Sequence, residues 1–308
     1  MIHRKVRIGS HGDQENMFFE RLRQILQSLV EAPHADPSAA RYRLIGFEPE
    51  VRSSEIRQAV AMSLNDITNP DPAWDAMTVR ESNIHEAYKI ICIHSLQLMT
   101  IDDVNAVLQA GVDTAIDLFF GHWWKSEEEI HSREDADQEI VFFNSFADGL
   151  LLAILARRWE DVERISDWAR QIDIASLCGV SPEIGSLYSV IASGIRNEPT
   201  ERADQSRLLI AKQRTKKTKI LLQAWDAVVA KDAELLAATM RESLIRFDKT
   251  VEKQGVGFAF PELIATPESV IYEIAQYNGM ELPLLPDNLS PYLVTRQSLG
   301  LEETTAEA

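Results

Sequence analysis

The sequence predicts an all-α protein of about ten helices, packed as antiparallel helical hairpins in a repeat-like array or a large bundle. Apolar residues recur at helical spacing through most of the 308 residues, and 45% of the residues are hydrophobic, enough for a substantial core. All twelve prolines fall between these periodic segments. The expected helices span residues 14–31, 53–66, 79–98, 101–121, 136–155, 159–172, 182–196, 202–230, 233–252 and 267–278.

The first 80 residues form either a distinct N-terminal helical subdomain or part of a single domain over residues 1–295. Two helices are expected there, at 14–31 and 53–66. Between them, residues 42–48 (YRLIGFE) have a strand-like pattern that is too short and isolated to imply a sheet. The helix expected from residue 101 starts within TIDD, Thr100 to Asp103. This stretch resembles a capping box with Asp in place of Glu.

The segment ARRWEDVERISDWARQI, residues 156–172, completes a helical hairpin. Before it, apolar residues repeat at helical spacing at Phe143, Phe146, Leu150 and Ile154. Within it, a second apolar stripe consists of Val162, Ile165, Ala169 and Ile172. Glu160 and Asp161 fall in the first turn of the second helix, where the helix dipole favours acids.

Trp159 lies at the corner of this hairpin. Its ring can cover the helix ends and place its indole N–H on a nearby carbonyl, or it can bind a ligand. We favour the structural role, because aromatic residues at cores and corners far outnumber those that bind ligands. Trp168 lies beside the same apolar stripe and receives the same interpretation.

A second hairpin follows the same pattern. Residues 227–234, AVVAKDAE, match residues 153–160, AILARRWE, at both alanines, at a basic residue and at the glutamate. Asp232 is expected to cap the second helix of this later hairpin. Two helix starts are expected to have a capping Ser or Thr before proline, Ser181 before Pro182 and Thr266 before Pro267. With two copies and no fixed period, the pattern does not establish a repeat array.

The end of the chain turns proline-rich from about Pro283 and closes with LEETTAEA. We expect residues 296–308 to form a flexible C-terminal tail.

The charge balance is the main compositional indication of function. The chain has 31 basic and 48 acidic residues, for a net charge of -17, which repels nucleic acid and anionic membranes and favours basic partners. No run of 18 uncharged apolar residues occurs, and only Cys92 and Cys178 could form disulfides. We therefore expect a cytoplasmic protein with no membrane partner, no nucleic-acid partner and two buried thiols; the oligomeric state stays open.

Three sequence patterns partly match known catalytic, metal-binding or cofactor-binding motifs. Glu128 and His131 have the Glu-x-x-His spacing of di-iron bundles, but no second such pair completes the ligand set. His85 and Cys92 share a helix face, yet their neighbours are typical of a core in which a thiol stays protonated. GVGFAF, residues 255–260, follows a helix and lacks the full dinucleotide-binding pattern. We expect no enzyme activity, no cofactor and no metal.

Two acidic segments are candidates for binding a basic partner, and each can also be read as solvated loop. Residues 125–139 contain seven acids against one lysine and one arginine, and residues 66–77 carry a tryptophan among three aspartates. The candidate partner-binding residues are Asp71, Trp74, Asp75, Glu127, Glu128, Glu129 and Asp135. Positive charge is concentrated in residues 212–219, KQRTKKTK. We interpret this run as a solvated helix face, either unpaired or paired with acidic side chains of a neighbouring segment.

The two hairpins, together with the closing segment FPELIATPESVIYEIAQYNGMELPLLPDNLSPYLV, resemble the type 49 immunity proteins of bacterial polymorphic toxin systems. The resemblance is one of pattern and order over roughly residues 80–295. It implies an all-α cytoplasmic protein that binds a cognate toxin domain and blocks it without catalysis. It implies no particular site residues.

The first hypothesis for function is therefore a non-catalytic immunity-type protein that neutralises a bacterial toxin, for which the acidity suits a basic domain such as a nuclease. The alternative is a helical scaffold that binds an endogenous protein between stacked hairpins. A third hypothesis, a metal-dependent helical enzyme, relies on Glu128 and His131 and requires bound metal.

Overall fold

The computed structural model describes residues 65, 76–94, 101–121, 136–171, 174, 181–254, 264–282, 285–286 and 289–301. The regular elements of these residues are all helical, which confirms the predicted fold class. They are α4 (Ala76–His94), α5 (Ile101–Phe120), α7 (Ala136–Leu155), α8 (Trp159–Gln171), α9 (Pro182–Ile195), α10 (Glu201–Lys212), α11 (Lys217–Ala230), α12 (Ala233–Gln254), α13 (Thr266–Tyr277) and the 3-10 turn η3 (Ser290–Tyr292). The helix expected at 14–31 and the strand-like residues 42–48 lie outside the described residues, as does the helix expected at 53–66 apart from residue 65.

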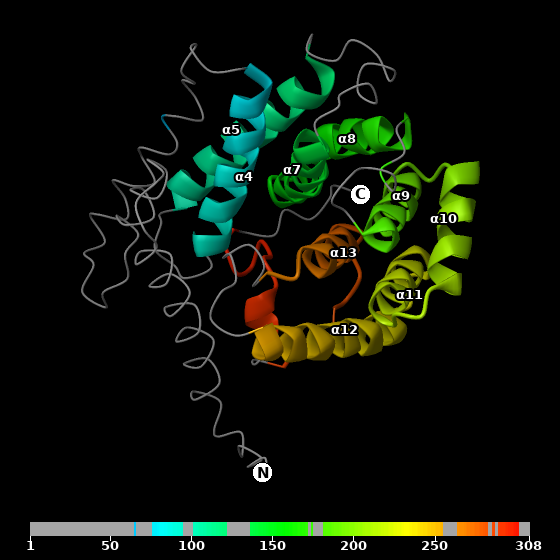
Figure 1. Cartoon of the computed structure of the whole chain (residues 1–308). Helices are drawn as coiled ribbons and strands as arrows, with labels where there is room; N and C mark the ends of the chain where they lie inside the picture. The colour runs from blue at the N-terminus through cyan, green and yellow to red at the C-terminus, as the bar shows by residue number, and fades with distance from the viewer. Residues whose placement is uncertain are drawn as a thin grey trace.

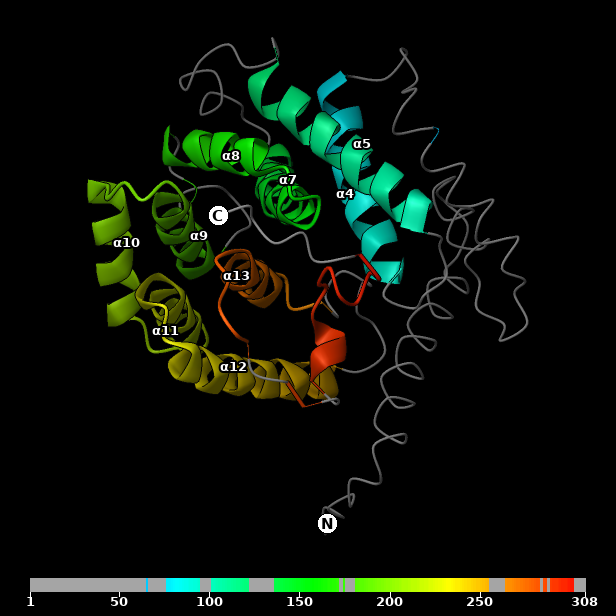
Figure 2. The same ribbon diagram turned by 180° about the vertical axis from the view of Figure 1, so that it is seen from behind.

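Helices that follow one another along the chain pack in pairs: α4 on α5, α7 on α8, α9 on α10, and α11 on α12 (Figure 1). These pairs curve around the last described α-helix, α13, which contacts α7, α11 and α12 from inside the curve (Figures 1 and 2). Among the described helices, none combines the length and the apolar character needed to cross a bilayer.

The ends of α7, α9, α11 and α13 share one turn geometry. Each closes with a residue of positive φ, between 50° and 71°, at Arg157, Asn197, Lys231 and Gly279. The N–H of that residue donates to the carbonyl three residues earlier, and the next N–H donates to the carbonyl five residues earlier, at 2.8 to 3.2 Å. This is the Schellman motif. Arg157 and Lys231 hold equivalent positions in the two matched segments, so their sequence similarity reflects a shared backbone turn. The structure shows the same turn at two further positions, Asn197 and Gly279.

Of the three predicted capping residues that the structure describes, two cap a helix. The Ser181 hydroxyl accepts from the N–H of Ile184 at 3.3 Å, and the Asp232 carboxylate accepts from the N–H of Leu235 at 3.0 Å. Glu160 and Asp161 lie in the first turn of α8 as expected. The prediction for Thr266 is wrong, because Ala265 is the capping position and the Thr266 hydroxyl instead lies 2.7 Å from the phenol oxygen of Tyr88.

The single helix predicted over 202–230 is two helices. α10 ends at Lys212, Gln213 takes an extended conformation, and α11 begins at Lys217. An unbroken helix would place Lys212 and Lys216 one turn apart, where like charges repel. The break turns the chain so that α11 can pack on α9, α12 and α13.

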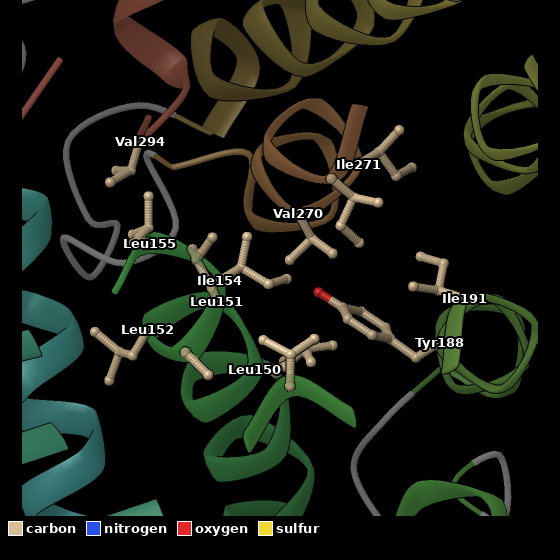
Figure 3. Packing of buried hydrophobic residues seen from close by; sticks show 14 of the residues in the cluster. Leu150, Leu151, Leu152, Ile154, Leu155, Tyr188, Ile191, Val270, Ile271 and Val294 are labelled. Atoms are coloured by element: carbon tan, nitrogen blue, oxygen red, sulfur yellow. The ribbon is translucent and has the colours of Figure 1, made fainter. Parts of the chain in front are cut away.

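The core is built around α7. Residues 150–155 of that helix are all buried. Figure 3 shows Leu150, Leu151 and Ile154 on the side of Tyr188 from α9 and Val270 from α13. Leu152 points the other way and packs near Gly111 of α5. Val294 enters the same cluster from the C-terminal segment. Each fully buried aliphatic side chain contributes about 1.5–3 kcal/mol. The predicted apolar stripes of the first hairpin are buried at each of their described positions, Phe146, Leu150, Ile154, Val162, Ile165 and Ala169.

The segment after η3 belongs to this core, which corrects the expected tail. The Arg296 guanidinium donates to the Leu155 carbonyl at 2.6 Å, and the Arg296 backbone N–H donates to the Glu273 carboxylate at 3.0 Å. Leu299 and Leu301 are buried. The prediction of a flexible tail is therefore wrong for residues 296–301. Residues 302–308 lie outside the described residues. The apolar spacing of two leucines in a short polar stretch gave too little signal to predict this.

Candidate functional site

The sequence-predicted partner-binding residues all lie outside the part of the chain that the structure describes. They are Asp71, Trp74, Asp75, Glu127, Glu128, Glu129 and Asp135. The same holds for His131, Cys178 and residues 255–260. Within the described ranges, no three His, Cys, Asp or Glu side chains gather closely enough to hold a metal ion.

A cluster of polar side chains lies where α4 meets α7 and the start of α13. The His85 Nδ1 atom is 3.0 Å from a carboxylate oxygen of Asp148 on α7. One turn along α4, the Tyr88 phenol bonds to the Thr266 hydroxyl, and it also bonds to the Cys92 thiol. Tyr88, Cys92 and Asp148 are buried. The cluster joins three helices that are distant in the sequence.

The electrostatics of this cluster are those of a buried core. Burial raises the pKa of Cys92 well above its usual value, and burial likewise raises the pKa of Tyr88. Burial also raises the pKa of Asp148, although the hydrogen bond from His85 opposes that shift. The thiol is therefore protonated at neutral pH and is a poor nucleophile. His85 and Cys92 do not pair with each other, and the expectation of a buried thiol at Cys92 is confirmed.

Two further carboxylates are fully buried on α13. Glu268 accepts a hydrogen bond from the Ser243 hydroxyl at 2.6 Å, and Glu273 receives the Arg296 N–H together with an ion pair to Arg157 at 3.3 Å. Neither acid is among the residues predicted from the sequence. The available signal was two glutamates five residues apart in ESVIYE, where the intervening residues are mostly apolar.

Trp159 begins α8 at the corner of the α7–α8 hairpin. Its half-buried ring stacks on Tyr277 with centroids 3.7 Å apart, and the Arg157 guanidinium lies 5.5 Å from the centre of the same Tyr277 ring. The stack joins the hairpin corner to the end of α13, as the structural interpretation of Trp159 requires. Trp168 is buried against Phe119 and Phe146, at centroid distances of 4.4 and 5.9 Å.

We expect Trp159→Ala to lower the free energy of unfolding by about 2 kcal/mol, less than a fully buried aromatic ring would lose. Trp159→Phe keeps a ring on Tyr277 and should lose less than half of that. Urea unfolding of the two variants measures both values. Unchanged stability in Trp159→Ala, combined with loss of binding to a partner, would instead identify Trp159 as a ligand-binding residue.

The alternating charges of residues 156–172 are used in ion pairs across α5, α8 and α9. Arg158 pairs with Asp113 and with Asp161, the latter at 2.6 Å. Arg196 pairs with Glu163 and with Asp167, the latter at 3.0 Å. Such a network orients the helices more than it stabilises them, because partly exposed ion pairs contribute about 0–1 kcal/mol each. These acids are thus already occupied by cations of the same chain.

The basic run forms the corner between α10 and α11. We define the basic corner as Lys212, Arg214, Lys216, Lys217 and Lys219. The first four side chains are exposed and Lys219 is half-buried. Lys216 is the capping residue of α11, and the first turn of that helix contains no acid. The prediction of a solvated surface is confirmed, although this surface is a break between two helices and not one helix face.

Comparisons of the chain with protein-family models, with curated proteins and with solved structures found no match.

Proposed function

We propose that the chain is a cytoplasmic, non-catalytic immunity-type protein that binds and neutralises a cognate bacterial toxin whose binding surface is basic. The observation that carries the proposal is the net charge of -17 on a helical protein. Opposite charges steer association, so an acidic inhibitor captures a basic target quickly. The resemblance to type 49 immunity proteins supports the same function.

The proposal that the protein is non-catalytic draws support from the buried ionisable groups. Asp148 bonds to His85, Glu268 bonds to Ser243, and Glu273 holds the C-terminal segment. Groups with shifted pKa values are often catalytic, but structural networks shift pKa values as well. Here Asp148 and Cys92, whose pKa values burial raises, lie within contacts between helices.

The acidic segments 66–75 and 125–139 are the proposed binding residues, with Trp74 as the aromatic anchor. Several described acids on the faces of α5 and α8 have cationic partners, such as Asp113 with Arg158. Residues 125–139 contain seven acids against two basic residues, and residues 66–75 contain three aspartates and no basic residue. An indole among matched charges is a common hot spot.

The test uses the purified chain and each toxin domain encoded beside its gene. We expect the association rate with the cognate domain to fall by about tenfold or more between low and high salt, while the dissociation rate changes little. The triple variant Glu127→Gln, Glu128→Gln, Glu129→Gln should slow association, and Trp74→Ala should speed dissociation. Stopped-flow fluorescence measures both rates.

The matched control neutralises three exposed acids on α10 and α12, in Glu201→Gln, Asp204→Asn, Glu234→Gln. It changes the net charge equally and should leave most of the association rate intact. A cognate toxin that binds tightly with a salt-independent rate, and to both triple variants alike, would refute the proposed mode of recognition. If the control alone slows association, the binding face lies on α10 and α12.

The helical scaffold alternative is favoured by one observation, the repeated Schellman turn that closes α7, α9, α11 and α13. Recurrent helical hairpins build the binding surfaces of many scaffold proteins. A scaffold would bind a protein of its own cell whether or not a toxin is present. Protection of cells that express the adjacent toxin gene separates the two functions, because only the immunity function predicts survival.

A further inference from the structure

The basic corner, Lys212, Arg214, Lys216, Lys217 and Lys219, is the densest group of positive charge in a chain of net charge -17. Within the described residues, none of its five side chains forms an ion pair. The Lys217 ammonium makes a cation–π contact, 5.9 Å from the centre of the Phe247 ring. By contrast Arg207, one turn earlier on α10, pairs with Asp226 of α11 at 2.7 Å. The fold thus compensates the cation next to the corner and leaves the corner itself open.

The position of these charges is unfavourable for the isolated chain. Lys216, Lys217 and Lys219 lie at the capping position and in the first turn of α11, where the helix dipole is positive and acids are preferred. The first turn contains no acid, and no side chain caps the helix. Like charges within one turn of each other also repel. An external anionic group would remove both penalties.

We propose that the basic corner is a docking surface for an acidic, carboxylate-rich segment of a partner polypeptide. A short acidic segment can neutralise five clustered cations while staying within about one Debye length, roughly 8 Å at physiological salt, of the corner. A nucleic acid extends beyond that distance and meets the repulsion of the remaining acidic surface. Residues 212–219 also contain no aromatic side chain on which bases could stack.

This surface is independent of the proposed toxin binding, because a basic toxin is repelled by the corner. The protein then has two oppositely charged surfaces, one for a basic target and one for an acidic partner. Loss of either interaction leaves the other measurable.

The experiment titrates a fluorescein-labelled octaglutamate peptide with the full chain and follows fluorescence anisotropy at low salt. We expect saturable binding that weakens as salt rises, and an apparent Kd about tenfold higher in the variant Arg214→Gln, Lys216→Gln. Both residues are exposed and lie between α10 and α11, so circular dichroism and the Tm should stay close to those of the parent chain.

The control variant Lys231→Gln, Arg241→Gln removes the same charge from two exposed cations away from the corner. Lys231 follows the opposite end of the 14-residue α11, about 20 Å from its start. The control should bind octaglutamate within about twofold of the parent chain. Equal weakening in both double variants, or no binding by the parent, overturns the proposal. Tighter binding of oligodeoxythymidine or of phosphatidylserine vesicles than of octaglutamate overturns the assignment to a polypeptide partner.

Discussion

Glu273→Ala should lower the free energy of unfolding by about 3–5 kcal/mol, the range for breaking a buried ion pair from one side. The carboxylate is fully buried, accepts the backbone N–H of Arg296 at 3.0 Å and pairs with Arg157 at 3.3 Å. Its loss leaves the Arg157 charge and the Arg296 N–H without their acceptor in the interior. Urea unfolding followed by circular dichroism measures the change.

Glu242→Ala is the matched control for that variant. Glu242 is exposed and pairs with Arg246 one helical turn away at 2.8 Å, so its removal should cost less than about 1 kcal/mol. Glu273→Gln should fall between the two, since the amide oxygen can still accept from Arg296 while the charge opposite Arg157 is lost. Similar small losses for Glu273→Ala and Glu242→Ala would show that Glu273 does not hold the C-terminal segment.

Gly194→Ala should cost about 3 kcal/mol, at the upper end of the range for overpacking a filled core. Gly194 lies near the end of α9, where the Trp225 ring of α11 passes directly over it. A Cβ atom at this position would lie 2.9 Å from Cε2 and 3.0 Å from Nε1 of that ring, and closer still to Cζ2. Because Trp225 is buried, the ring cannot simply move into solvent.

The double variant Gly194→Ala, Trp225→Phe tests that cause. A phenyl ring lacks the part of the indole that would meet the new methyl group, so Gly194→Ala should cost at least 1 kcal/mol less in the Trp225→Phe background. Unfolding free energies of the four proteins give this coupling. An equal cost in both backgrounds would mean that the glycine is needed for a reason other than the indole.

The sequence was sufficient to predict the all-α class and most helix boundaries. Prolines such as Pro182 and caps such as Ser181 act through local backbone chemistry, which the sequence states directly. The corner at Arg157 and its counterpart at Lys231 were found for the same reason, since a short motif fixes the turn. The break between α10 and α11 was missed because residues 212–219 contain no proline or glycine, the residues that most often mark the end of a helix.

What the sequence did not reveal depends on contacts over long separations. The local signal that Glu268 and Glu273 lie in the interior is weak, since each is stabilised by a partner on another segment, Ser243 and Arg296. The basic corner was visible as a run of charge. Its lack of intramolecular partners was not, because that depends on where the acids of neighbouring helices end up. The predicted acidic binding residues stay predictions.

The position of α13 and of the segment that follows it has a consequence for the timing of folding. The Tyr88–Thr266 bond spans 178 residues and the Arg296–Leu155 bond spans 141, so the contacts that complete the core have high contact order. During synthesis the first described hairpins leave the ribosome long before Arg296 does. Until then the inner face of α7 lacks its cover, so we expect the nascent chain to be held in an incomplete, aggregation-prone state that resolves only after the segment around Arg296 has left the ribosome.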